Sequence, residues 1–193
     1  LGVTPTQVQP WVKRRYDYPA THDDEAKTVL LHFYFVLDWL GEPSPLEGQT
    51  LAWQHPQKLN VSPVLPANKP IMHALSLPNI YAISNAEKIG QAAFLNALQE
   101  QLQQGVVKLV LIREKKMDRK MLLDFSISVH ALTKQYGARV LIDSDVGLAA
   151  ALSLDGVHLS RQSLLQLKSK PIGLFVAASC HNELELKHAQ ELG

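Results

Sequence analysis

Four short polar clusters stand at the ends of apolar runs in the second half of this sequence, where they could bind and transform a small anion. In chain order they are Arg113-Glu114-Lys115-Lys116, Asp143-Ser144-Asp145, His158 and Ser179-Cys180-His181. Arg113 and Lys115 lie two residues apart, so both side chains would project to the same side of an extended segment and could clamp a phosphate or pyrophosphate. A solvated loop is the other explanation of this basic cluster.

The two histidines of these clusters suggest different roles. His181 follows a strand in a loop beside Ser179, and an imidazole titrates near neutral pH, so His181 is the candidate acid or base. His158 lies within an apolar strand and is interpreted as a core histidine with one satisfied nitrogen. Cys180 is interpreted as a small packed residue rather than a nucleophile, because it has no evident partner beyond the adjacent histidine.

The first half of the chain offers a second set of candidates. Glu47 lies in a loop between Trp39 and Trp53, and Asn68 follows a proline-containing turn. A carboxylate can bind a metal ion or activate water, an aromatic ring can stack on a base, and an Asn can present both a donor and an acceptor to a purine edge. A turn Asn, core tryptophans and a solvated Glu explain the same residues on composition alone.

The elements that must position the second-half clusters alternate between strand and helix. Strands are expected over residues 80–83, 106–112, 139–142, 156–159 and 172–177, each followed by a helix. Caps mark three helix starts: Ser84 with Glu87 as a capping box, Asp118, and Asn182 with Glu185. The fold class is therefore α/β, with about five βα units where a closed (β/α)8 barrel needs eight, and an open doubly wound sheet is the alternative.

The first half reads as sheet with long loops. A strand over Thr28–Leu37, apolar on both faces and expected to be covered on both, follows a polar, acidic loop that includes Asp23. The pattern predicts a hairpin of this strand with a second strand near Leu51–Gln54. Four prolines then flank a short predicted helix over Lys69–Leu75 and mark a domain boundary, which we place between residues 76 and 77.

Composition excludes several classes of function. Apolar residues form 46% of the chain and charged residues 19%, which is a globular composition, and the formal charge of +1 gives no basic stripe for duplex nucleic acid or a membrane surface. The longest apolar stretch is about half of the roughly 18 residues that span a bilayer. Cys180 is the only cysteine, so no intrachain disulfide can form, and a reducing, cytoplasmic location is expected.

A series of motifs runs in order through the first 75 residues: Leu1-Gly2-Val3, Tyr18-Pro19, Trp39, Gly41-Glu42-Pro43, Glu47-Gly48-Gln49, Trp53 and Pro66-Ala67-Asn68. This order resembles the second half of a MutT-type Nudix hydrolase. In that family a box ending in two glutamates, any residue, glycine and an aliphatic residue supplies the metal ligands. Leu1-Gly2-Val3 match the last three positions, so the main ligands would lie upstream of Leu1.

The Nudix resemblance implies hydrolysis of a nucleoside triphosphate, typically oxidised dGTP, to the monophosphate and pyrophosphate. Magnesium or manganese would act on the phosphates and orient the attacking water. By position Asn68 would read the base, and Glu47 would be the loop acid, a possible metal ligand. Without the upstream glutamates we expect the chain as given to be inactive in this reaction.

The second-half clusters resemble those of the thiamine phosphate synthase and thiazole tautomerase superfamily, a TIM-barrel group, across residues 80–193. The resemblance retains Arg113 and Lys115 of a basic strand motif. It implies a magnesium pyrophosphate site in the synthase, whose two aspartates are replaced here by Ser144 and Ser163. The tautomerase needs a phosphate site and an acid or base instead, and Ser179-Cys180-His181 fits its Ser-x-His motif.

Together the two resemblances predict the C-terminal portion of a Nudix α/β/α domain over residues 1–76 and an incomplete TIM barrel over residues 77–193. We assign the main function to the first domain, as a nucleotide-sanitising pyrophosphohydrolase. The alternatives are a thiamine phosphate synthase or thiazole tautomerase, which would bind a thiazole or pyrimidine phosphate through Arg113, Lys115, Ser179 and His181, and a non-catalytic module that binds such precursors.

Overall fold

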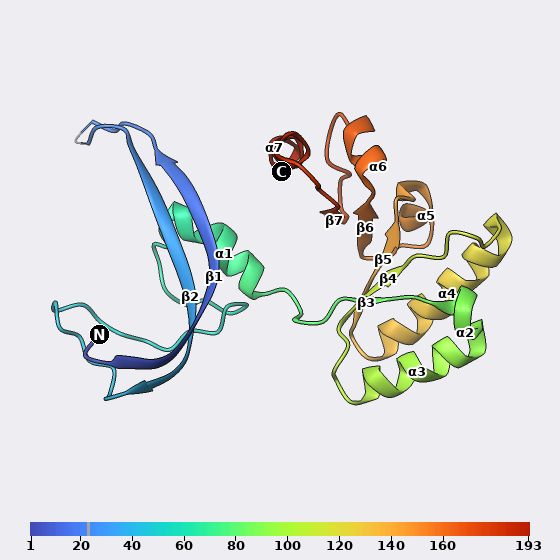
Figure 1. Ribbon diagram of the computed structural model, residues 1–193, viewed down its shortest axis with the longest axis horizontal. Helices are drawn as coiled ribbons and strands as arrows, with labels where there is room; N and C mark the ends of the chain where they lie inside the picture. The colour runs from blue at the N-terminus through green and yellow to red at the C-terminus, as the bar shows by residue number, and fades with distance from the viewer. Residues whose placement is uncertain (23) are drawn as a thin grey trace. The chain divides into compact units, whose positions relative to one another are not determined.

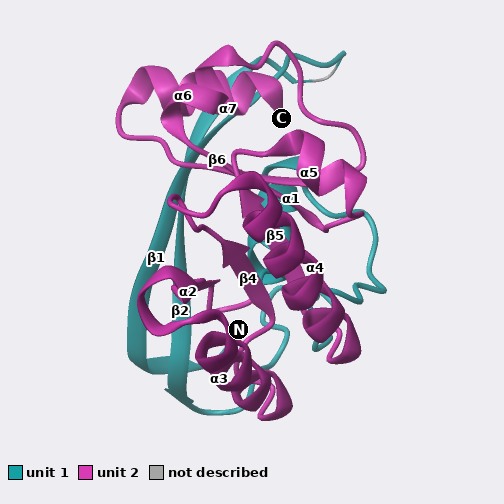
Figure 2. Cartoon of the chain, turned by 90° about the vertical axis from the view of Figure 1, so that its right-hand side faces the viewer, with its two compact units in different colours: residues 1–77 teal, residues 78–193 magenta. Residues whose placement is uncertain are grey.

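The computed structural model describes residues 1–22 and 24–193 and divides the chain into two compact units, coloured separately in Figure 2. Unit 1 comprises residues 1–77 and unit 2 comprises residues 78–193. Asp23, in the predicted acidic loop, lies outside the described residues. Over those described ranges, no helix combines the length and apolar character needed to cross a membrane.

Unit 1 is built on one long antiparallel strand pair (Figure 1). β1 (Thr4–Tyr18) pairs with β2 (Lys27–Leu40), and the register shifts near Pro5 and Pro10 of β1. Proline has no N–H to donate to the ladder, so irregular pairing at these positions is expected. A 3-10 turn, η1 (Pro66–Asn68), leads into the helix α1 (Lys69–Leu75), which confirms the helix predicted there.

Two expectations for unit 1 are wrong. β2 pairs with β1 and not with residues 51–54, which form no strand. The faces of β2 are also not both covered, because Phe33 and Phe35 on one face are half-buried while Leu30 and Tyr34 on the other are 62% and 50% exposed. Apolar residues on both faces of a strand indicated burial, but a two-stranded ladder supplies no second layer to bury the outer face.

Unit 2 is a five-stranded sheet in which every neighbouring pair is parallel and the spatial order follows the chain order, as the α/β prediction requires. Its strands are β3 (Ala82–Ile83), β4 (Leu109–Ile112), β5 (Arg139–Asp143), β6 (Gly156–Leu159) and β7 (Phe175–Ala178). Its helices are α2 (Ala86–Ile89), α3 (Gln91–Gln103), α4 (Arg119–Gln135), α5 (Val146–Ala151), α6 (Arg161–Gln166) and α7 (Glu183–Leu192).

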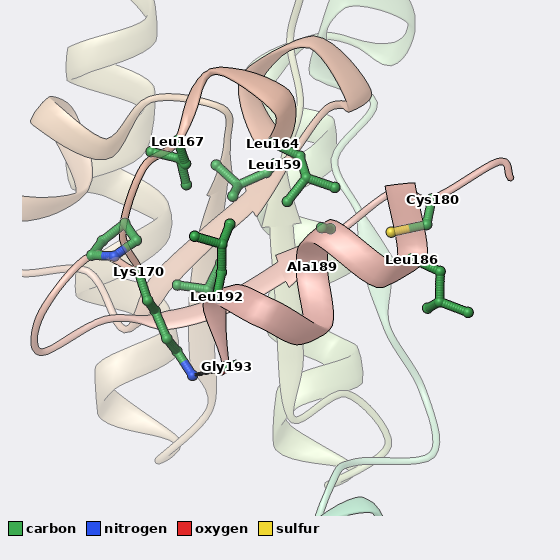
Figure 3. Close-up of a pocket in the computed structure, with 12 residues that line it drawn as sticks. Leu159, Leu164, Leu167, Lys170, Cys180, Leu186, Ala189, Leu192 and Gly193 are labelled. Atoms are coloured by element: carbon green, nitrogen blue, oxygen red, sulfur yellow. Dashed lines mark hydrogen bonds between the residues drawn. The ribbon is translucent and has the colours of Figure 1, made fainter. Parts of the chain in front are cut away.

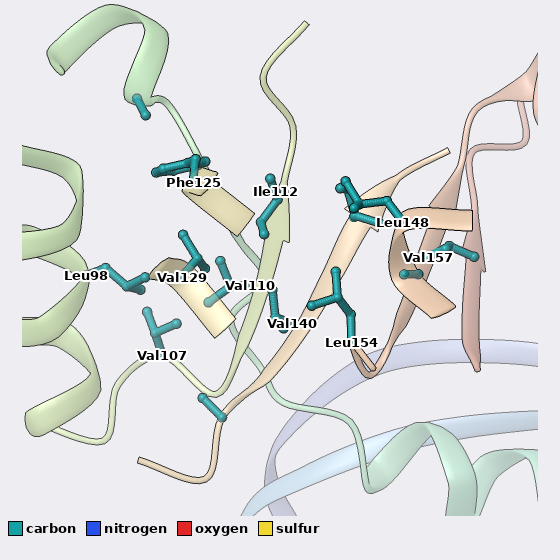
Figure 4. Packing of buried hydrophobic residues seen from close by; sticks show 14 of the residues in the cluster. Leu98, Val107, Val110, Ile112, Phe125, Val129, Val140, Leu148, Leu154 and Val157 are labelled. Carbon is teal, nitrogen blue, oxygen red and sulfur yellow. The ribbon is translucent and has the colours of Figure 1, made fainter. Parts of the chain in front are cut away.

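The helices of unit 2 all pack against one face of this sheet. Alternate strand residues such as Val110, Ile112 and Val140 join helix residues such as Phe125 and Val129 in the main core, shown in Figure 4. The intervening strand residues form a small separate cluster without helix residues, made of Tyr81, Leu109, Leu111, Leu141, Phe175 and Ala177. In an open doubly wound sheet both faces would pack against helices, so the arrangement differs from that alternative.

Two of the three predicted helix caps are confirmed. The Asp118 carboxylate accepts the Met121 N–H at 2.8 Å, and the Asn182 side chain accepts the Glu185 N–H at 3.0 Å. The predicted box of Ser84 and Glu87 does not form, because these side chains bind the backbone of the segment after β4 instead.

A buried carboxylate, in place of the predicted capping box, binds the backbone N–H groups at the start of α2. Glu114, only 6% exposed, accepts the N–H groups of Ala86 at 2.7 Å and Glu87 at 2.9 Å. The Ser84 hydroxyl accepts the Arg113 N–H at 2.9 Å. These bonds satisfy otherwise unpaired donors at a helix N-terminus and fix the backbone on both sides of Arg113.

We predict that Gly156→Ala destabilises unit 2 severely. A Cβ at Gly156 would lie 1.9 Å from the carbonyl oxygen of Phe175 in the adjacent strand, so β6 and β7 would have to separate. The expected loss is about 3 kcal/mol in the free energy of unfolding, measured by urea denaturation of the full-length protein. Gly147→Ala in α5, where the nearest atom to the new Cβ is 3.7 Å away, is the matched control. Equal stability of the two variants would contradict the prediction.

Candidate anion-binding site at the carboxyl ends of the strands

Five polar side chains gather on the helix-free face of the unit 2 sheet. Arg113, Asp143 and Ser179 each follow the apolar residues of that face at a two-residue spacing, beyond Leu111, Leu141 and Ala177 respectively. His158 pairs in register with Asp143 on one side and Ala177 on the other. Tyr81, immediately before β3, reaches His158 across the same face. The parallel strands therefore bring together side chains that lie up to 98 positions apart in the sequence, from Tyr81 to Ser179.

Arg113 and Asp143 form an ion pair at the outer edge of this site. Arg113 Nε lies 3.3 Å from Asp143 Oδ2, and the Ser144 hydroxyl donates to Asp143 Oδ1 at 2.9 Å. The Arg113 side chain is 47% exposed and that of Asp143 is 21% exposed. An ion pair this open to solvent contributes little to stability, so an incoming anion can compete with the carboxylate for the guanidinium.

His158 lies at the centre of the site with both ring nitrogens engaged. Its Nε2 is 2.9 Å from the Ser179 hydroxyl, and its Nδ1 is 3.2 Å from the Tyr81 hydroxyl. Burial lowers the pKa of His158, Arg113 lowers it further, and the Asp143 carboxylate opposes both. Burial, together with Asp143, raises the pKa of Tyr81 to about 12, so the phenol keeps its proton at neutral pH.

The site contains some of the predicted residues but not in the predicted pairing. Ser179 and Arg113 belong to it, and Lys115 is exposed in the segment two residues beyond Arg113. The imidazole bonded to Ser179 is that of His158, whereas His181 is exposed and donates its backbone N–H to Glu185 at 2.7 Å. The role predicted for His181 remains a prediction.

Cys180 faces the other side of the sheet. It packs against the main core and lines an apolar cavity of about 220 Å³ between strands β6 and β7 and helices α6 and α7, shown in Figure 3. Leu159, Leu164 and Leu192 line the same cavity. Alternation along the strand thus separates the cysteine from the neighbouring Ser179, as the interpretation of a packed residue requires.

The residues around Asp143 do not fit a magnesium site. Ser163 and Ser160 share a hydrogen bond at 2.9 Å between their hydroxyls, and the Ser144 hydroxyl accepts the Ser160 N–H at 3.0 Å while it donates to Asp143. Hard divalent cations favour several charged oxygens, and here one carboxylate is already paired with an arginine. Within residues 1–22 and 24–193, no group of three or more His, Cys, Asp or Glu side chains could hold a metal ion.

The candidates of unit 1 do not assemble into a comparable site. Glu47 is exposed, with its backbone N–H bonded to the Gln49 side chain at 2.8 Å, and the Asn68 N–H caps the turn at Leu65. Trp39 and Trp53 lie with ring centroids 6.1 Å apart and line a cavity of about 550 Å³. The residues that line this cavity are all apolar, so it offers no carboxylate to phosphate chemistry.

A parallel sheet with a cation, a carboxylate and a histidine at the carboxyl ends of its strands defines an α/β protein with a candidate small-ligand site. The family described as thiamine monophosphate synthase matches residues 80–193, more than half of the chain. The chain therefore belongs to the thiamine monophosphate synthase family.

Two relatives whose names include thiamine-phosphate synthase agree with this assignment. The protein named "Putative thiamine-phosphate synthase 2" of Aquifex aeolicus is 36% identical over 121 residues, which are 62% of this chain and 64% of that protein. The thiamine-phosphate synthase of Desulfitobacterium hafniense is 31% identical over 94 residues, 49% of this chain and 45% of that protein. A thiamine phosphate pyrophosphorylase structure from Pyrococcus furiosus aligns with a TM-score of 0.46 and 21% identity, covering 58% of this chain and 55% of that one. The chain thus spans about half to two thirds of the length of these proteins.

These findings correct the function expected from the sequence. The assignment to a Nudix pyrophosphohydrolase, inactive as given, is wrong, because the matching family and the relatives are thiamine phosphate synthases, which are transferases. No comparison supports a Nudix portion over residues 1–76, a nucleoside triphosphate ligand, or magnesium or manganese bound there. The second resemblance is confirmed at the level of the family.

We predict that His158 titrates below its ordinary pKa of 6.5 in the folded protein. Asp143→Asn removes the attraction that favours the imidazolium and should lower this pKa further, whereas Arg113→Gln removes a repulsion and should raise it. An NMR titration of the full-length protein, followed by the chemical shifts of the imidazole nitrogens, measures the pKa of His158 in the wild type and in both variants. Because folding favours the neutral ring, His158 lowers the free energy of unfolding progressively as the pH falls from 6.5 to the lowered pKa. Below that pKa the loss stays constant. Identical pKa values in both variants would contradict the electrostatic account.

Proposed function

We propose that the full-length protein is a transferase of the thiamine phosphate synthase type, which joins a pyrimidine pyrophosphate to a thiazole phosphate. The observation that supports this most is the position of Arg113, a half-exposed guanidinium at the carboxyl edge of the sheet, in a segment that belongs to the family. Lys115, two residues beyond it, adds a second cation. The two residues are suited to hold a phosphate or pyrophosphate group.

We propose that unit 2 is the first part of a (β/α)8 barrel. Its five parallel strands in chain order, with the helices on one face, are the arrangement that such a barrel repeats. The helix-free face would then be the barrel interior, with Leu111 and Leu141 as its apolar filling and the polar side chains at its carboxyl end. Active sites of barrels lie at that end.

The proposed chemistry uses the cations of this chain and no metal. In the transfer, the bond between the pyrimidine methylene carbon and the pyrophosphate oxygen breaks, and the thiazole nitrogen forms a bond to the same carbon. Arg113 and Lys115 would stabilise the negative charge on the departing pyrophosphate. Magnesium, which the family resemblance implies for the synthase, does not fit the hydroxyls of Ser144 and Ser163, so we assign it no step.

A second candidate is a thiazole phosphate tautomerase. The observation that favours it is the hydrogen bond between Ser179 and His158, in a site whose residues do not fit a divalent cation. A tautomerase moves a proton within one phosphorylated ring, which needs only an anion site and an acid or base. Both candidates share the phosphate anchor at Arg113. For both, a cytoplasmic location stays a prediction.

The anchor is tested by the affinity of the full-length protein for thiazole phosphate, measured by titration calorimetry. Arg113→Ala should weaken binding about 10- to 100-fold, because it removes a hydrogen bond between charged groups. Arg119→Ala, which removes an equal charge from an exposed residue paired with Asp145, should bind like the wild type. Equal affinities of the two variants would contradict an anchor at Arg113.

Metal dependence and turnover separate the remaining alternatives. We expect binding and turnover to persist in EDTA, since the site residues do not fit a metal. Formation of thiamine phosphate from the two precursors supports the transferase, and isomerisation of a thiazole phosphate alone supports the tautomerase. Binding without either turnover would contradict both and leave a module that only binds precursors.

A further inference from the structure

A row of three hydrogen-bonding side chains crosses the helix-free face of unit 2, the face on which Arg113 and Asp143 also lie. Tyr81, His158 and Ser179 come from the first, fourth and fifth strands of the sheet or their ends, and each is half-buried. The distances along the row are 3.2 Å from phenol to Nδ1 and 2.9 Å from Nε2 to the serine hydroxyl. Both ring nitrogens of His158 are therefore occupied, and Ser179 is the shorter of the two contacts through which the ring can exchange a proton.

The polar groups around His158 suit reversible proton storage. Tyr81 keeps its proton at neutral pH, and its oxygen can accept a hydrogen bond from the Nδ1–H group of His158. The unprotonated Nε2 then accepts a hydrogen bond from the Ser179 hydroxyl. Asp143 on the neighbouring strand favours the imidazolium, and Arg113 disfavours it. Tyr81, Asp143 and Arg113 are thus the titratable or charged groups that act on the ring, and Ser179 is its partner from the β7 side.

We propose that Ser179 is the group that exchanges a proton with the bound ligand and that His158 is the positioning residue that receives this proton. The inference rests on the tautomerase candidate of the proposed function, because the ligand is a phosphorylated thiazole ring anchored at Arg113 within which a proton moves. As the ligand gives a proton to Ser179 Oγ, the original hydroxyl proton passes to His158 Nε2. The imidazolium returns it through Ser179 to another atom of the ligand, so protons balance and no bond to the protein forms.

This inference assigns to His158 the role that the sequence suggested for His181. Ser179 is adjacent in sequence to the loop that holds His181, but its hydroxyl is bonded to the imidazole of His158. The half-buried His158 also has a lowered pKa, and the neutral form that accepts a proton is the form that the site favours.

The test compares turnover of thiazole phosphate by the full-length protein with that of His158→Gln, across a range of pH. Gln can keep the hydrogen bond to Ser179 but cannot take up a proton. We expect a loss of about 100-fold or more in kcat, with the affinity for thiazole phosphate retained. The wild-type rate should fall as the pH drops through a pKa below 6.5, and this acid limb should vanish in His158→Gln. Ser179→Ala should lose a similar factor.

Two controls separate this role from a structural one. His188→Gln changes a half-buried histidine of α7 that contacts the Leu164 carbonyl at 3.2 Å, outside the site, and should keep the wild-type rate and pH profile. If His158→Gln does not fold, as judged by thermal unfolding, Tyr81→Phe decides: it removes the partner of Nδ1 and should shift the acid limb.

The outcomes distinguish this inference from the function on which it rests. Wild-type protein that binds and turns over thiazole phosphate, with an unchanged rate and pH profile in His158→Gln, would overturn the proton-transfer role and leave the proposed function standing. Loss of the acid limb in His181→Gln instead would also overturn it. Wild-type protein that joins the two precursors but does not isomerise a thiazole phosphate would overturn the inference and leave the transferase standing. Wild-type protein that does not bind thiazole phosphate would contradict the proposed function itself.

Discussion

The parallel register of strands β4, β5 and β6 is the constraint on which the site depends. The bonds that set Leu111 opposite Leu141 and Asp143 opposite His158 also decide which side chains face the helices and which face the opposite side. A shift by one residue would send Asp143 into the helix-packed core and an apolar residue into the site. Close approach of β6 to Phe175 at Gly156 fixes the position of β7, and with it that of Ser179.

The sequence was sufficient to predict the alternating elements of unit 2, because α3 and α4 show apolar residues at helical spacing and two helices have a capping side chain at the predicted position, Asp118 and Asn182. It also placed Arg113 and Ser179 at strand ends. It did not predict that Ser179 contacts His158, since that contact depends on the pairing of β6 with β7 and on the direction of two side chains. Counting two residues at a time from Leu141 and Ala177 would have placed Asp143 and Ser179 on one face, but the reach of Tyr81 needs the tertiary structure.

The errors in unit 1 have a common physical origin. The order of short motifs along a chain does not show which side chains lie close together in space. Residues such as Glu47, Trp53 and Asn68 also occur commonly in loops without a function. A phosphate-processing site requires several charged groups to converge, and the cavity beside Trp39 and Trp53 is lined only by apolar residues. The charge needed for such chemistry lies in unit 2, in the segment that the thiamine monophosphate synthase family covers.

The central claim is that Arg113 exchanges Asp143 for the phosphate of a ligand on the helix-free face. A crystal structure of the full-length protein with bound thiazole phosphate tests it most directly. The account predicts phosphate oxygens within hydrogen-bond distance of the Arg113 guanidinium, a longer separation than the present 3.3 Å between Arg113 Nε and Asp143 Oδ2, and the thiazole ring beside Ser179. Phosphate density elsewhere, with the ion pair unchanged, would contradict it.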